Sequence, residues 1–77
     1  MGNKYLVTDS LEDGKRMVRY STDSAYYAVE RYALRHLEHN SRTMVYAVLL
    51  CPLAVALTFY VKVSSLGDLD ITEVHDD

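Results

Sequence analysis

The chain has almost none of the residues that cross-link small proteins. Its 77 residues include a single cysteine, Cys51, so no disulfide can form within the chain. A lone thiol inside an apolar stretch is typical of an inert, buried side chain in a reducing compartment. We therefore expect a cytoplasmic protein whose core has no covalent staple.

The sequence signals of catalysis are also scarce. The three glycines are isolated, so both common glycine-rich phosphate-binding motifs are absent. The serines lack the context of a catalytic nucleophile, and the carboxylates lie in turns and near the C-terminal end rather than in a buried setting. The first ten residues have no apolar segment behind a basic head, so we expect no secretory signal. We expect no enzymatic activity and no cofactor.

Three histidines raise the question of a metal site. His36 and His39 are three residues apart, and His75 could join them in space. Helical histidine pairs that bind zinc are usually four residues apart and have further ligands at known spacing. Histidines near a helix end also interact favourably with the helix dipole. We therefore predict no metal.

The length of the chain predicts one domain, residues 1–77. So short a chain buries a modest fraction of its surface, and its core is only marginally sufficient without a staple or a partner. A homodimer would bury more apolar area without adding chain.

One uncharged stretch dominates the second half. The 18 residues from Met44 to Val61 carry no charge, which suits either a helix across a bilayer or two strands. From Leu53 to Ser64 large and small side chains alternate, which is the period of a strand with one face on a core. Pro52 would break a helix but fits between two strands.

We therefore favour two strands, Met44–Cys51 and Leu53–Val63. The first is apolar at nearly every position, which is typical of a central strand covered on both sides or of a strand at an interface. One alternative is a small single-pass membrane protein with its span over 44–61, whose preceding arginines would place the N-terminus in the cytoplasm. Another is a structural dimer in which Met44–Cys51 pairs with its twin.

The remaining strands are short. Lys4–Thr8 and Lys15–Tyr20 are predicted to form a hairpin around the turn Asp13-Gly14. After a turn that begins at Ser64, Leu69–His75 is predicted as the last strand.

A helix is predicted between the hairpin and the central strands. Ser21, Thr22 and Asp23 are candidate N-caps, and Asn40 is a plausible C-terminal stop. Apolar positions at helical spacing form one face: Ala25, Ala28, Val29, Tyr32, Ala33, His36 and Leu37. Because such a helix is unstable alone in water, it needs a sheet built on the central stretch. The sequence thus predicts an α+β fold, with a small antiparallel sheet in ββαβββ order and one amphipathic helix on one face.

Charge and aromatic residues suggest two contact surfaces. After Ser64 there are five acidic residues and no lysine or arginine, which makes a negative field that attracts basic partners. Tyrosine and arginine are typical interface anchors, and the solvent face of the helix carries both. The net charge of −3 disfavours direct nucleic-acid binding. The candidate partner-binding residues are Tyr27, Arg31, Leu34, Asp68, Asp70 and Glu73.

Four segments, KYLV, MVRYSTDSAYYAVERYA, ALTFYVKV and LDITEV, cover most of the chain. In their order and layout the chain resembles small inhibitors encoded by phages and mobile elements, among them several anti-CRISPR proteins. The resemblance implies a non-enzymatic protein that docks an acidic or aromatic face on a larger host complex. Such docking blocks a nucleic-acid path or a conformational change. The likeness is one of layout, so it assigns no binding residue.

Overall fold

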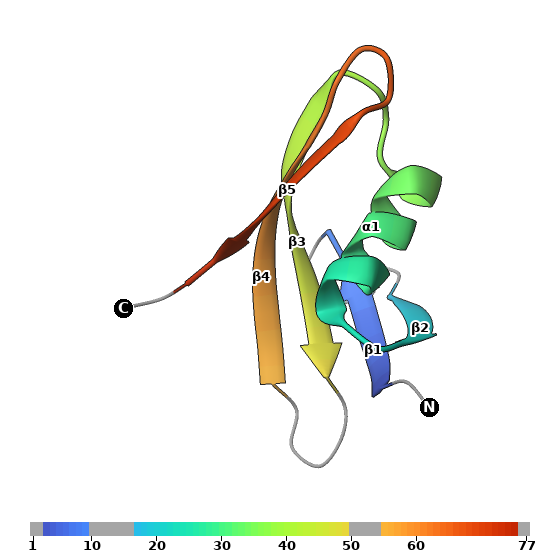
Figure 1. Cartoon of the computed structure of the whole chain (residues 1–77), viewed down its shortest axis with the longest axis vertical. Helices are drawn as coiled ribbons and strands as arrows, with labels where there is room; N and C mark the ends of the chain where they lie inside the picture. Colours follow the sequence, from blue (N-terminus) through green and yellow to red (C-terminus); the bar gives the residue numbers. More distant parts are fainter. Residues whose placement is uncertain (1–2, 10–16, 50–54, 76–77) are drawn as a thin grey trace.

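The chain folds into five strands and one helix. The computed structural model describes residues 3–9, 17–49 and 55–75. The elements are β1 (Asn3–Thr8), β2 (Val18–Thr22), α1 (Ala25–His36), β3 (Ser41–Leu49), β4 (Val55–Val63) and β5 (Leu69–Val74). The strands form one antiparallel sheet in the order β2-β1-β3-β4-β5, and α1 lies across one face of it (Figure 1). This confirms the predicted ββαβββ order and the α+β class.

The central stretch forms the longest strand pair. β3 and β4 pair over all nine residues of each. Phe59, Val61 and Val63 are buried, as the alternation predicts. Val55 has the same parity but is 47% exposed, since it is the first residue of β4 and lies farthest from the buried positions. Several predicted features lie outside the described residues: the turn at Asp13-Gly14, and Cys51, Pro52 and Leu53.

The alternative prediction, a membrane-spanning helix over residues 44–61, is wrong. Residues 44–49 and 55–61 instead form two strands that pair with each other. Within the described ranges, no helix has the length and apolar character needed to cross a bilayer.

Helix α1 begins and ends at other residues than predicted, because the predicted end residues interact with segments distant in the sequence. Ser24 is the N-cap, and its Oγ accepts a hydrogen bond from the Tyr27 N–H at 3.3 Å. The predicted caps Ser21 and Thr22 are instead paired with β1, because β2 extends to Thr22. The helix ends at His36 rather than Asn40. Asn40 has a φ of 60° and its N–H donates to the Ser64 carbonyl at 3.0 Å, so it turns the chain toward β3.

Small side chains on α1 meet branched side chains on the sheet. Ala28, Val29 and Ala33 are almost completely buried against a core that includes Val45 and Val61. Alanine lets the helix backbone approach the sheet closely, and the β-branched residues fill the space between. His36 was predicted on this face but is exposed. Its ring instead lies 4.8 Å from the Tyr32 ring, centroid to centroid.

β3 occupies the centre of the sheet. Over Tyr46–Leu49 it pairs with β1 on one side and β4 on the other, so it has no free edge there for a twin strand. The predicted strand pairing between two copies is therefore wrong over these residues, and β2 and β5 are the edges. On the face away from α1, Met44, Tyr46 and Val48 are half-buried. A homodimer stays a prediction and would need another surface.

A tyrosine hydroxyl ties α1 to the end of β1. The Tyr32 hydroxyl donates to Asp9 Oδ1 at 3.0 Å and accepts from the Asp9 N–H at 3.3 Å. Burial raises the pKa of Tyr32, and the hydrogen bond to Asp9 raises it further. A folded-state pKa above the unfolded value means that the neutral phenol stabilises the fold. That stabilisation is present below about pH 10 and is lost as the pH rises through the raised pKa.

We predict that Tyr32→Phe lowers the free energy of unfolding at neutral pH by about 1 kcal/mol, because one buried hydrogen-bonded pair is lost. The variant should also lose stability less steeply than the native chain above about pH 10. Urea unfolding across pH, followed by circular dichroism, measures both. Tyr26→Phe, at an exposed position, is the control and should leave both unchanged. If Tyr32→Phe and the native chain lose unfolding free energy equally above about pH 10, the Tyr32 phenol does not control stability at alkaline pH.

Candidate functional site: the outer stripe of α1 and two surface hollows

The solvent side of α1 carries large side chains of the kind that anchor interfaces. Tyr27, Arg31 and Leu34 are spaced four and three residues apart, so they form one line along the helix, here named the α1 stripe. Tyr27 is 54% exposed and Leu34 is 66% exposed. Tyr26 packs edge-on against Tyr27, with ring centroids 6.1 Å apart. The structure thus brings three of the predicted contact residues together on one face.

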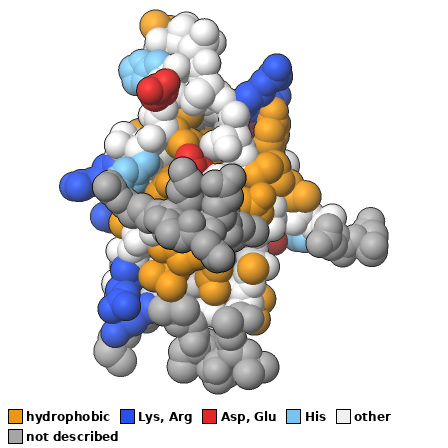
Figure 2. Space-filling model, turned by 180° about the vertical axis from the view of Figure 1, so that it is seen from behind, with side chains coloured by type: hydrophobic (Ala, Val, Ile, Leu, Met, Phe, Trp, Pro, Cys, Tyr) orange, Lys and Arg blue, Asp and Glu red, His pale blue; other side chains and the backbone are white. Residues whose placement is uncertain are grey.

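A hollow of about 550 Å³, here named the β2–α1 pocket, lies between the edge strand and the helix. It is lined by Val18, Arg19, Tyr20, Arg31, Leu34, Arg35 and His36. None of these lining residues is acidic. From behind, Lys and Arg side chains follow the flank of the molecule that carries β1 and β2, on the left in Figure 2. This flank is therefore basic although the whole chain is acidic.

Tyr20 is the unusual residue of the β2–α1 pocket. Its hydroxyl is buried and has no hydrogen-bond partner within the described part of the chain. Burial raises the pKa of Tyr20, and the positive charges of Arg35 and Arg31 partly oppose that rise. A buried polar group left unsatisfied costs about 1–3 kcal/mol, so natural proteins rarely keep one without a reason.

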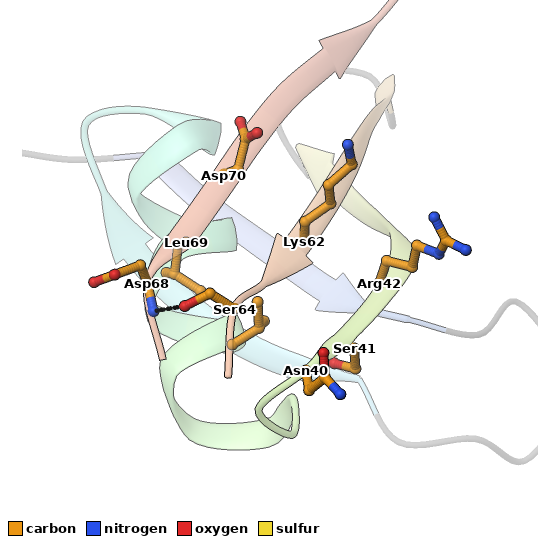
Figure 3. A pocket seen from close by; sticks show the side chains of 9 residues that line it. Asn40, Ser41, Arg42, Lys62, Ser64, Asp68, Leu69 and Asp70 are labelled. Atoms are coloured by element: carbon orange, nitrogen blue, oxygen red, sulfur yellow. Dashed lines mark hydrogen bonds between the residues drawn. The ribbon is translucent and has the colours of Figure 1, made fainter. Parts of the chain in front are cut away.

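A second hollow, of about 560 Å³ and here named the hairpin hollow, lies where β3, β4 and β5 meet the turn before β5. Its lining residues are Asn40, Ser41, Arg42, Lys62, Val63, Ser64, Asp68, Leu69 and Asp70. The strand register places Arg42 opposite Lys62, and Lys62 opposite Asp70. Figure 3 shows Lys62 and Asp70 rising from neighbouring strands in the same direction. This hollow therefore combines charges of both signs.

The turn beside the hairpin hollow is built around one serine. Ser64 Oγ accepts hydrogen bonds from the N–H groups of Asp68 at 3.0 Å and Leu66 at 3.2 Å. The Asp68 bond is drawn in Figure 3, where the carboxylate of Asp68 points away from the other charges. Gly67 completes the turn with a φ of 90°, and a Cβ there would lie 2.9 Å from His39 Nε2. The positive φ therefore favours glycine, and any larger residue would also require the exposed His39 ring to move.

The predicted acidic surface is not one patch. Asp70 and Glu73 are three positions apart in β5, so they project from opposite faces of the sheet. Asp70 lies beside Lys62, and Glu73 Oε2 lies 3.6 Å from His75 Nδ1. The last two acidic residues lie outside the described residues. The structure therefore separates the acidic contact residues that the sequence grouped.

The three histidines also lie apart. His36 contacts the Tyr32 ring, His39 lies against Gly67, and His75 lies beside Glu73. In residues 3–9, 17–49 and 55–75, no three His, Cys, Asp or Glu side chains are placed to hold a metal ion.

Comparison of the chain with protein-family models, with curated proteins and with solved structures finds no match. Function therefore has to be inferred from the side chains of this chain.

The sequence did not predict the β2–α1 pocket. It indicated Arg31 and Leu34 as site residues, but not Tyr20 or Arg35. The one available signal was the spacing of Arg31 and Arg35, which are four residues apart and share a helix face. Nothing in the sequence indicated that Tyr20, on a separate strand, would join them.

We predict that Gly67→Ala lowers the free energy of unfolding by about 1 kcal/mol, because alanine is strained at a positive φ and its Cβ meets the His39 ring. The double variant His39→Ala/Gly67→Ala should recover the stability lost through the clash with the His39 ring, but not the stability lost through backbone strain at Gly67. Urea unfolding midpoints of the two variants and of His39→Ala separate the two contributions. Ser65→Ala, at an exposed turn position, is the control. Equal midpoints for Gly67→Ala and the native chain would contradict the prediction.

Proposed function

We propose that this chain is a non-enzymatic binding protein that docks on a larger protein through the α1 stripe. The observation that carries the proposal is the exposure of Tyr27 and Leu34 on one helix face, with Arg31 between them. Aromatic residues and arginine are enriched at the anchoring positions of interfaces. Exposed apolar side chains that share a face indicate a contact surface more strongly than scattered ones.

The burial of the other side of α1 supports this docking mode. Ala28, Val29 and Ala33 hold the helix on the sheet, so the stripe is ordered before a partner arrives. A preorganised surface loses less conformational entropy on binding. Other exposed apolar residues, such as Met17 and Leu66, lie singly outside the helix and strands.

The finer proposal follows the resemblance to phage and mobile-element inhibitors. We propose that the partner is a host defence complex of the CRISPR type in the host cytoplasm, and that docking blocks its nucleic-acid path or its activation. Such complexes present basic surfaces to nucleic acid, and Asp68, Asp70 and Glu73 add negative charge for approach to them. Direct nucleic-acid binding is not part of the proposal, because the chain carries a net charge of −3.

We predict that the double variant Tyr27→Ala/Leu34→Ala loses its partner, because each anchor residue contributes about 2 kcal/mol to such interfaces and their joint loss weakens binding more than tenfold. Affinity capture from host lysate with the native chain, the double variant and Leu66→Ala, followed by quantitative mass spectrometry, tests this. Leu66 is 84% exposed in the turn before β5, so Leu66→Ala is a control of similar chemistry at another site. The partner is the protein retained by the native chain and the control but depleted with the double variant. Equal retention by all three would refute docking through the stripe.

The charge-reversed variant Asp68→Lys/Asp70→Lys/Glu73→Lys tests the finer proposal. If the captured partner presents a basic surface, the variant should associate more slowly and with a flatter dependence on salt. Association rates measured at low and high ionic strength give both quantities, and target-DNA cleavage by the purified complex reports the inhibition. An unchanged association rate would show that these acidic residues do not contribute to association with the partner. It would not bear on docking through the α1 stripe, which the Tyr27→Ala/Leu34→Ala variant tests.

A further inference from the structure

We propose that the β2–α1 pocket binds a phosphate group, either as the free ion or as the phosphate ester of a small molecule. This inference does not rest on the proposed docking function, because its key residues, Tyr20 and Arg35, lie outside the α1 stripe.

The first support is the charge of the pocket. Arg31 and Arg35 line it from α1, and its described lining includes no aspartate or glutamate. Arg31 and Arg35 are four residues apart on one helix, where like charges repel each other. A bound anion would convert this repulsion into two charge-assisted hydrogen bonds.

The second support is the hydroxyl of Tyr20. It is buried and lacks a hydrogen-bond partner within the described residues, and Tyr20 is one of the residues that line the pocket together with the arginines. Because the hydroxyl is covered in this structure, a ligand would reach it only after a neighbouring side chain moved, and a phosphate oxygen would then accept a hydrogen bond from the O–H. The positive charges of Arg35 and Arg31 oppose the rise that burial causes in the pKa of Tyr20. An anion bound in the pocket would lie beside both α1 guanidinium groups that line it.

The number of donors favours phosphate over carboxylate. The guanidinium groups of Arg31 and Arg35 offer more N–H donors than the two oxygens of a carboxylate can use. A phosphate monoester has three acceptor oxygens and nearly two negative charges at neutral pH. The hollow of about 550 Å³ exceeds a lone phosphate, and Val18 and Leu34 supply apolar lining for the remainder of a small molecule.

Titration of the full chain with inorganic phosphate, followed by amide NMR shifts, tests the inference. We expect saturable shifts at Tyr20, Arg31 and Arg35, and none with chloride at equal ionic strength. Arg35→Gln should weaken phosphate binding about tenfold, since a charge-assisted hydrogen bond is removed. Arg42→Gln, an exposed arginine in the hairpin hollow, is the matched control and should bind phosphate like the native chain.

Tyr20→Phe separates ligand binding from a purely structural role. In phosphate-free buffer it should leave the melting temperature unchanged or raise it, because it removes an unsatisfied hydroxyl. With phosphate present it should show less ligand-induced stabilisation than the native chain. Adenosine monophosphate that binds more tightly than phosphate would indicate an ester, and equal affinity would indicate the phosphate group alone. Shifts that chloride reproduces, or an equal loss of binding in Arg42→Gln, would overturn the proposal.

Discussion

The close contact between the alanine face of α1 and the sheet is the constraint on which the rest of the structure depends. A chain of 77 residues can build only one core, and α1 supplies the layer that covers the sheet. Ala28 and Ala33 keep the helix near the strands, and Val29 fills the gap between them. Because these positions must face the sheet, helical geometry decides where every other residue of α1 points.

Three distinct faces of one short helix follow from that geometry. Its inner face forms the core, its outer face presents Tyr27 and Leu34, and the side toward β2 presents Arg31 and Arg35 to the pocket with Tyr20. The Tyr32–Asp9 hydrogen bonds then tie the helix to the end of β1. A shift of α1 on the sheet would disturb the core, the α1 stripe and the β2–α1 pocket together, so the stability of the core and the shape of both surfaces are linked.

Periodic patterns were the part of the fold that the sequence could predict. The alternation in β4 and the apolar face of α1 were both confirmed, because burial on one side imposes its period on the residues themselves. The ends of elements were not predictable in the same way. Ser21 looks like a cap but is paired with β1, and Asn40 looks like a helix stop but donates to the Ser64 carbonyl. Each is decided by a partner distant in the sequence.

The two hollows differ in how well their charged and polar groups are paired. In the hairpin hollow Lys62 lies between Arg42 on β3 and Asp70 on β5, so an acid on one side offsets the like charge on the other. The Lys62 Nζ also lies 5.7 Å from the centroid of the Tyr60 ring, within the range of a cation–π contact. In the β2–α1 pocket like charges are neighbours and a hydroxyl is buried without a partner in the described chain. Small domains have only about 5–15 kcal/mol of net stability, so unsatisfied groups are expected to persist mainly where function uses them. By that criterion the β2–α1 pocket, rather than the better-compensated hollow beside the hairpin, is the place to look for a ligand.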